Sequence, residues 1–273
     1  MSEKKHVALV LGSGGARGLA HIGAIEALEE RGYTISSIAG CSMGSIIAGM
    51  YAAGQLKQAK EWFLRVDKQL ILRMLDINLL SRNSLVKGQR IIEELKKVVP
   101  DRPIETLHIP CAIVASDMLH TEEVVFRSGS LFDAIRASIS IPLFFEPVTL
   151  ENRLLIDGGI LNPLPLQAVE RQEGDILVAA DISGKDSIPM DSKIHFVRIL
   201  DRMSDMQIQQ NTLMALRLTP PDIHAVMRQY AYNTFDFDKA EQIIADGKRI
   251  MNEALDAYEA KIGHVLPAQG DYE

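Results

Sequence analysis

The sequence predicts an α/β fold with a central, mostly parallel β-sheet. Short apolar runs rich in β-branched residues alternate with helical patterns along most of the 273 residues. Some of these runs are continuously apolar, which is typical of strands buried on both faces of a parallel sheet. Glycine-rich turns follow the first two runs, at residues 12–18 and 40–44. Ligands bind at such strand ends in parallel sheets.

Two strand–turn–helix units open the chain. Residues 6–11 predict the first strand, and a glycine-rich loop at 12–18 (GSGGARG) precedes a helical pattern over 19–30. Residues 34–39 predict the second strand, and a helix of small and apolar residues is expected over 45–53. In the first unit, the backbone N–H groups of the loop can face an anion or an oxyanion.

The remaining elements follow from the same patterns. A mostly helical region is expected over 55–99, in which residues 55–85 suit either helices packed on the core or a mobile cap that meets a lipid surface. The two prolines of residues 141–147 exclude a regular helix or a central strand there. Further strands are predicted at 109–115, 123–126, 153–156, 175–181 and 194–200, with helices at 130–138, 203–216 and 238–261.

Composition excludes several classes of protein. The chain has 29 Lys and Arg against 36 Asp and Glu, a formal net charge of −7, so no nucleic-acid partner is expected. Two cysteines cannot make a disulfide framework and suit a reducing compartment. Residues 1–11 lack a signal-peptide pattern, and the glycines and serines of the uncharged stretch 32–56 argue against a membrane span. We expect one cytoplasmic domain over 1–273, with core motifs at about 6–200 and a helical portion at about 201–273.

Residues 40–44 (GCSMG) match the G-x-S-x-G nucleophile elbow at a predicted strand-to-helix junction. A serine on such a tight turn occupies a strained backbone region, and glycine neighbours avoid the clashes that side chains would cause. The exposed hydroxyl lies at a helix N-terminus, whose partial positive charge favours an oxygen that carries negative charge. Ser42 is therefore the candidate nucleophile, although chance alone produces some matches to so short a pattern.

The glycine-rich loop at 12–18 is compatible with three kinds of site. A Walker phosphate loop needs a lysine near its end, and this loop has none. A dinucleotide-binding loop needs glycine where Arg17 stands, and an acidic residue where the second strand runs into Gly40. The third kind is an oxyanion hole that faces the serine on the neighbouring strand end. Its donors would be the backbone N–H groups of Gly14, Gly15 and Ala16.

A serine nucleophile needs a base. Asp157 ends a predicted strand before two glycines, where an ordinary turn is common and where a catalytic carboxylate would also lie. The order Ser, Asp, His of α/β-hydrolases is formally available through His195 or His224. However, His195 falls inside a strand pattern and His224 follows two prolines, so neither lies on a glycine-bounded loop.

Together these motifs resemble the patatin-like phospholipase family, and above all its short bacterial members. The likeness spans roughly residues 6–200 and is carried by 12–18, 40–44 and 157–159 (DGG), with similar stretches at 136–142 (RASISIP) and 162–165 (NPLP). The family's strict glycine motif has Gly where Ser13 stands, which should matter little because a backbone N–H acts there. The resemblance implies a three-layer α/β/α fold.

The resemblance also implies a Ser-Asp dyad without histidine, with Ser42 as nucleophile and Asp157 as base. The oxyanion donors would be Gly14, Gly15 and Ala16. The expected reaction is hydrolysis of an acyl ester or phospholipid through an acyl-enzyme, near the inner face of a membrane. No metal or other cofactor is expected, because no cluster has metal-ligand spacing. Apolar residues in 141–145 would raise the pKa of the aspartate toward working pH.

The roles of some neighbouring residues, and whether the protein is an enzyme at all, have alternative interpretations. Arg17 is expected to hold the glycine loop through a salt bridge, and a sharper hypothesis gives it contact with an anionic phospholipid head group. Cys41 and His21 are expected to be structural. The alternative to an enzyme is a regulatory or adaptor protein on the same scaffold with little turnover, since a fold does not determine a function. The intact serine, aspartate and glycine loop favour the enzyme.

Overall fold

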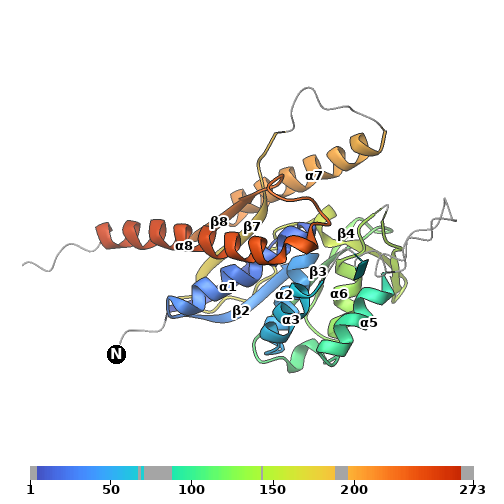
Figure 1. Cartoon of the computed structure of the whole chain (residues 1–273), viewed down its shortest axis with the longest axis horizontal. Helices are drawn as coiled ribbons and strands as arrows, with labels where there is room; N and C mark the ends of the chain where they lie inside the picture. Colours follow the sequence, from blue (N-terminus) through green and yellow to red (C-terminus); the bar gives the residue numbers. More distant parts are fainter. Residues whose placement is uncertain (1–4, 67–68, 71–87, 143, 188–195, 266–273) are drawn as a thin grey trace, which may run out of the picture.

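A computed structural model describes residues 5–66, 69–70, 88–142, 144–187 and 196–265, and it has the predicted α/β architecture (Figure 1). Its strands are β1 (Lys5–Leu11), β2 (Tyr33–Cys41), β3 (Cys111–Asp117), β4 (Glu122–Phe126), β5 (Val148–Leu150), β6 (Arg153–Asp157), β7 (Ile176–Gly184) and β8 (Ile223–Arg228). Its helices are α1 (Ala20–Glu30), α2 (Met43–Ala52), α3 (Leu56–Leu64), α5 (Gln89–Val98), α6 (Leu131–Ser138), α7 (Phe196–Leu218) and α8 (Ala240–Val265).

The strands form one mixed sheet within the described residues, in the order β5-β6-β3-β2-β1-β7-β8, with β4 paired to β3. The block β3-β2-β1-β7-β8 is parallel throughout. Strands β4, β5 and β6 add antiparallel pairs at one side. The first two glycine-rich turns therefore lie side by side at the carboxyl ends of β1 and β2.

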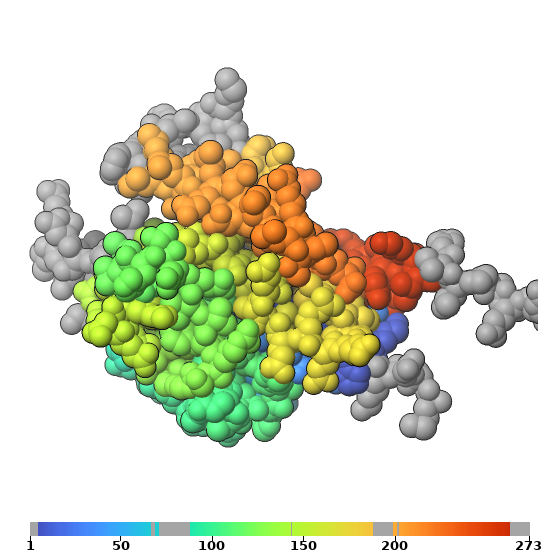
Figure 2. Space-filling view, turned by 180° about the vertical axis from the view of Figure 1, so that it is seen from behind, coloured from blue at the N-terminus to red at the C-terminus, as the bar shows by residue number. Residues whose placement is uncertain are grey.

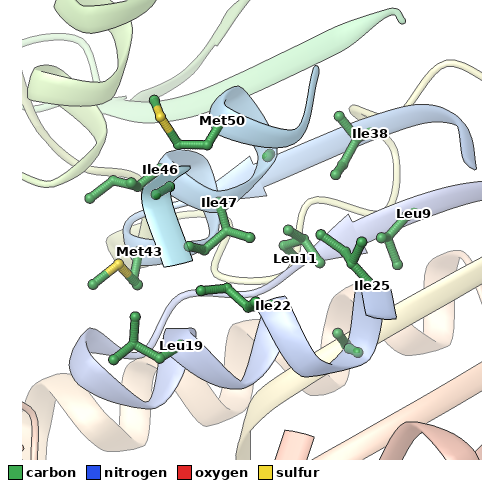
Figure 3. Close-up of a cluster of buried hydrophobic side chains, with 14 of the residues drawn as sticks. Leu9, Leu11, Leu19, Ile22, Ile25, Ile38, Met43, Ile46, Ile47 and Met50 are labelled. Atoms are coloured by element: carbon green, nitrogen blue, oxygen red, sulfur yellow. The ribbon is translucent and has the colours of Figure 1, made fainter. Parts of the chain in front are cut away.

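Alternate residues of β1 pack against opposite layers of the molecule. Leu9 and Leu11 belong to a core that includes apolar side chains of α1 and α2, which Figure 3 shows together. Ala8 and Val10 point the other way and pack with residues 164–169, and Leu216 of α7 packs against that second core. Helices α1 and α8 lie side by side on the first face (Figure 1), so the sheet lies between two helical layers.

One predicted strand is wrong. Residues 196–200 of the strand predicted at 194–200 instead form the start of the long helix α7, and β8 takes the last place in the sheet. A short apolar run does not distinguish a strand from a helix, and this one continues the helical pattern that follows it. By contrast, β8 alternates buried and exposed residues, as an edge strand with one covered face does. The short strand β5 was also not predicted.

The helical region predicted at 55–99 is described in part. Helices α3 and α5 lie where expected. Most of the segment 55–85 that the sequence suggested as a cap lies outside the described residues. Among the helices that the structure describes, none is both long and apolar enough to span a membrane.

Candidate active site

Ser42 lies at the turn between β2 and α2 with a backbone φ of 55° and ψ of −124°. A positive φ is rare for a residue with a side chain and is a sign of backbone strain. A Cβ atom on Gly40 would lie 2.3 Å from the Gly44 carbonyl oxygen, and one on Gly44 would lie 2.3 Å from the Leu11 carbonyl oxygen. Only glycine fits at these two positions, so the chain forms the predicted tight turn for a steric reason.

The edge of β3 brings Ser42 and Asp157 together. Cys41, the last residue of β2, pairs with Val114, and Asp157, the last residue of β6, pairs with the next residue, Ala115. β4 pairs with one edge of β3, so β2 and β6 both lie along the other edge. There the carboxyl ends of β2 and β6 face each other. Two residues that are 115 positions apart in the sequence therefore come into contact.

Ser42 and Asp157 form a direct hydrogen bond in a buried setting. The Ser42 hydroxyl donates to Asp157 Oδ2 at 2.6 Å. Asp157 Oδ1 accepts a hydrogen bond from the Gly159 backbone N–H at 2.7 Å. Burial raises the pKa of Asp157 to about 6, while these two hydrogen bonds act in the opposite direction. Near neutral pH the carboxylate is therefore ionised and also basic enough to take a proton from a neighbouring hydroxyl.

Two further serines hold this pair in place. Ser138 accepts a hydrogen bond from the Ser42 backbone N–H at 2.9 Å and donates its own proton to the Val114 carbonyl at 2.6 Å. The Ser140 carbonyl oxygen accepts a hydrogen bond from the Asp157 N–H at 2.9 Å. Both serines belong to the RASISIP stretch, to which the sequence analysis assigned no role. That stretch therefore positions both candidate catalytic residues.

Two backbone N–H groups of the glycine-rich loop are available to a ligand. The Ala16 N–H donates to the Thr234 carbonyl at 2.8 Å and is occupied. Within the described part of the chain, the backbone N–H groups of Gly14 and Gly15 have no hydrogen-bond acceptor. Gly15 and Ser42 line the same cavity. Of the three predicted oxyanion donors, this geometry favours Gly14 and Gly15.

Arg17 and His21 anchor the glycine-rich loop at residues 12–18 through hydrogen bonds to backbone carbonyls. The buried Arg17 guanidinium donates to the Ile182 carbonyl at 3.1 Å and to the Tyr232 carbonyl at 2.9 Å. This placement favours the anchoring role of Arg17 over contact with a head group. His21 Nε2 lies 2.8 Å from the Gly12 carbonyl oxygen. Burial lowers the pKa of His21 to about 4, so a neutral imidazole donates this hydrogen bond near neutral pH.

The other candidate groups do not join the dyad. His224 Nε2 lies 3.2 Å from Asp181 Oδ2, and His195 lies outside the described residues. Burial raises the pKa of the Cys41 thiol well above its usual value, so the thiol stays protonated and is a poor nucleophile. Over the ranges that the structure describes, no three His, Cys, Asp or Glu side chains gather as a metal-binding group.

A cavity of about 700 Å³, counted with the open space at its mouth, lies beside Ser42. Its walls come from α2, α3, α5, the segment after α6 and the connection between β8 and α8. Apart from Gly15 and the hydroxyl-bearing Ser42 and Thr234, the lining residues are apolar or aromatic. This apolar lining suits a hydrocarbon chain.

Two side chains from the C-terminal third of the chain support the site, and sequence reasoning missed them. The side-chain amides of Gln207 and Asn211 in α7 donate to the Ile160 carbonyl at 2.9 and 2.8 Å. Ile160 ends the turn Gly158–Ile160 that directly follows Asp157. The only sequence feature that could have indicated this role is a pair of amides four residues apart, which puts them on one helix face. No known sequence motif marks such a pair.

The sequence matches the patatin-like phospholipases over residues 9–169. The chain belongs to the patatin-like phospholipase family. An NTE family protein of Mycobacterium tuberculosis is 43% identical over 188 residues, which are 69% of this chain and 52% of that protein. The human patatin-like phospholipase domain-containing protein 6 is 34% identical over 187 residues, which are 66% of this chain and 14% of that protein.

Two further matches extend over nearly the whole chain. A lysophospholipase of Candida glabrata is 29% identical over 295 residues, which cover 97% of this chain and 17% of that protein. The crystal structure of VipD from Legionella pneumophila aligns with a TM-score of 0.49 and 15% identity, and covers 94% of this chain and 67% of that one. This patatin-like chain spans about half of the mycobacterial relative and a smaller share of the human and Candida proteins.

Proposed function

We propose that the protein is a serine acyl hydrolase that cleaves carboxylic esters of lipids, with Ser42 and Asp157 as its catalytic dyad. The observation that carries the proposal is the 2.6 Å hydrogen bond from the Ser42 hydroxyl to Asp157. It places a nucleophile in contact with its base, beside a cavity with an apolar lining. Membership of the patatin-like phospholipase family supports lipid esters as substrates.

In the first half-reaction, Asp157 takes the proton of the Ser42 hydroxyl while the oxygen attacks the ester carbonyl carbon. The carbonyl π electrons move onto oxygen, and the N–H groups of Gly14 and Gly15 stabilise the resulting oxyanion. When the tetrahedral intermediate collapses, the ester C–O bond breaks. Asp157 gives its proton to the departing alcohol, and the acyl group remains on Ser42.

In the second half-reaction, Asp157 takes a proton from a water molecule whose oxygen attacks the acyl carbon. The bond between this carbon and the Ser42 oxygen then breaks, and Asp157 returns the proton to the serine. The carboxylic acid leaves. One carboxylate serves both steps because a pKa of about 6 for Asp157 lets it accept and then release a proton near neutral pH.

The test is hydrolysis of a chromogenic medium-chain acyl ester by the wild type, Ser42→Ala and Asp157→Asn, each shown to be folded by circular dichroism. We expect background activity for Ser42→Ala and a loss on the order of 10⁴ in kcat for Asp157→Asn. Ser37→Ala is the matched control, because Ser37 is a buried serine in the middle of β2, away from the site, and its hydroxyl donates to the Glu170 carbonyl. Activity that survives Ser42→Ala would overturn the assignment.

The alternative is a patatin-like regulatory or adaptor protein with little turnover. It predicts that the folded wild type hydrolyses no member of a panel of acyl esters and lysophospholipids. The strained backbone of Ser42 and the buried Asp157 carboxylate both favour the enzyme, because a binding scaffold needs neither of these costly features.

We also propose that helix α7 makes peripheral contact with membrane surfaces. Six large apolar residues of α7 are exposed within the described part of the chain: Ile199, Met203, Met206, Leu213, Met214 and Leu218. Most of them share a helix face roughly opposite to Thr212, which is buried and whose hydroxyl contacts the Ser183 hydroxyl of β7. Figure 2 shows α7 (orange) on the outer surface of the molecule. An exposed helix with one apolar face is suited to lie in a membrane interface.

Sedimentation with phosphatidylcholine vesicles tests this contact. A neutral lipid is appropriate because the chain carries a net charge of −7. The double variant Met203→Ser, Met206→Ser should lose most of the vesicle-bound fraction. The control variant Met118→Ser, Leu119→Ser removes two exposed apolar side chains from the turn between β3 and β4. Equal binding by the two double variants would contradict contact through α7.

A further inference from the structure

We propose that Phe144 and Phe235 form an aromatic gate that selects which acyl chains enter the cavity beside Ser42. This inference builds on the proposed acyl hydrolase function and assigns its chain selectivity to two side chains. The ring centroids of the two residues are 5.3 Å apart, and the ring planes are inclined by 60°. This is the geometry of direct contact between aromatic rings.

The aromatic gate spans the distance from the cavity wall to the protein surface. Phe235 lines the cavity. Phe144 is 41% exposed, whereas its neighbour Phe145 is buried and lines the cavity as well. The pair of rings therefore connects the cavity lining at Phe235 with the exposed surface at Phe144. An acyl chain that extends past this pair has to displace one of the rings.

The two gate residues come from segments that are far apart in the sequence. Phe144 follows α6, and its backbone N–H donates to the Ile141 carbonyl at 3.2 Å. Phe235 lies in the connection between β8 and α8, beyond the residues 9–169 that match the family. The outer ring thus belongs to the matched segment and the inner ring does not. Selectivity set by this contact is a property that relatives need not share.

The connection that carries Phe235 is attached to the glycine-rich loop. The Thr234 carbonyl accepts a hydrogen bond of 2.8 Å from the Ala16 N–H, and the Tyr232 carbonyl accepts one of 2.9 Å from Arg17. These bonds fix the backbone beside Phe235 relative to the proposed oxyanion donors. Ring size at the gate, rather than movement of the connection, then decides which chains pass.

The first experiment measures binding without turnover, on the Ser42→Ala background. Octanoate and palmitate compete with a fluorescent fatty acid, and the ratio of their dissociation constants is compared among gate variants. Phe235→Ala and Phe144→Ala should each shift this ratio toward palmitate by roughly tenfold. The double variant should shift it by less than the product of the single shifts, because the two rings act as one barrier. Leu119→Ala, at an exposed apolar residue of the turn between β3 and β4, should leave the ratio unchanged.

Phe235→Leu and Phe144→Leu repeat the measurement with smaller losses of volume, in case an alanine variant does not fold. An unchanged ratio in the folded gate variants would overturn the gate, and so would single effects that multiply in the double variant. The kcat/KM ratio for p-nitrophenyl palmitate over p-nitrophenyl octanoate, with Ser42 intact, should move in the same direction. A shifted binding ratio in a protein that hydrolyses no ester would retain the gate and refute the proposed hydrolase.

Discussion

The Ser138 hydroxyl accepts a hydrogen bond from the backbone N–H of Ser42 at 2.9 Å. The same hydroxyl donates to the Val114 carbonyl in β3 at 2.6 Å. One buried side chain therefore ties the strained turn after β2 to the middle of the sheet. Strained backbone persists only where the surrounding structure holds it, and this pair of hydrogen bonds is one such restraint on Ser42.

Ser138→Ala should lower both stability and activity. The change leaves a buried N–H and a buried carbonyl without this partner, so we expect the free energy of unfolding to fall by about 1–3 kcal/mol. Because Ser42 loses a restraint, kcat should fall at least roughly tenfold with little change in KM. Urea denaturation and ester hydrolysis measure the two effects. Ser37→Ala should show a similar stability loss with kcat unchanged, and an equal loss of kcat in both variants would contradict the positioning role.

The pH dependence of catalysis should report the ionisation of Asp157. A general base acts in its ionised form, and burial raises the pKa of this carboxyl to about 6. We therefore expect kcat/KM to rise with pH through a midpoint near 6 and to level off above it. Initial rates in buffers of constant ionic strength provide the profile. A midpoint near 4, the ordinary range of aspartate, would show that the carboxyl is not the buried base described here.

The same carboxyl should make the fold less stable as pH rises. Its pKa is higher in the folded chain than the usual 3.8, so folding favours the protonated form. The stability that this group contributes is present below pH 3.8 and is lost as pH rises toward about 6, a change of roughly 3 kcal/mol.

Asp157→Asn removes this ionisation and should therefore stabilise the protein, relative to wild type, more near pH 7 than near pH 4. Chemical denaturation of both proteins at the two pH values measures the difference. An identical difference at both pH values would mean that the carboxyl does not titrate as described. The variant couples the proposed loss of activity to a gain in stability, as expected where a functional group is buried at a cost.

Gly44→Ala should prevent formation of the turn at Ser42. Its new Cβ atom would lie 2.3 Å from the Leu11 carbonyl oxygen, and backbone on both sides leaves little room to move. We expect destabilisation of about 3 kcal/mol or more, measured as a fall in Tm. Gly49→Ala in the same helix is the control, since its Cβ atom would meet only the ends of the Leu131 and Ile135 side chains. A smaller effect for Gly44→Ala than for this control would contradict the steric argument.

The amides of α7 should influence catalysis from outside the cavity. Asn211→Ala removes a 2.8 Å hydrogen bond to the Ile160 carbonyl, near the turn that follows Asp157. Combined with Gln207→Ala, which removes the second bond of 2.9 Å, it should lower kcat roughly tenfold with KM unchanged. Gln210→Ala, on the exposed side of the same helix, should have no effect. An unaltered kcat in the double variant would limit these amides to a structural role.

Much of the fold follows from local patterns. Continuous apolar runs predicted β1, β2, β3 and β7, and the helices between them were found where the sequence placed them. The strand predicted at residues 194–200 was wrong because a short apolar run there directly joins a helical pattern. The spacing of apolar residues in so short a run does not distinguish a strand from a helix. Edge strand β8 was missed because it is only six residues long, follows two prolines, and has His224 and Arg228 at exposed positions that break its apolar run.

The sequence by itself determined the tight turn at Ser42, because steric limits at Gly40 and Gly44 act between neighbouring segments of β1, β2 and α2. It also determined that glycine-rich loops end the first two strands. The tertiary structure alone decided which groups meet there. Asp157 reaches Ser42 because β2 and β6 share one edge of β3.

The remaining contacts of the site depend equally on packing. The Ala16 N–H is occupied because the connection before α8 passes over the glycine loop and offers the Thr234 carbonyl. Similarly, Phe235 meets Phe144 only because that connection reaches the cavity. Hydrogen-bond and ring partners that are distant in the chain are chosen by how layers pack, and no local pattern of residues records that choice.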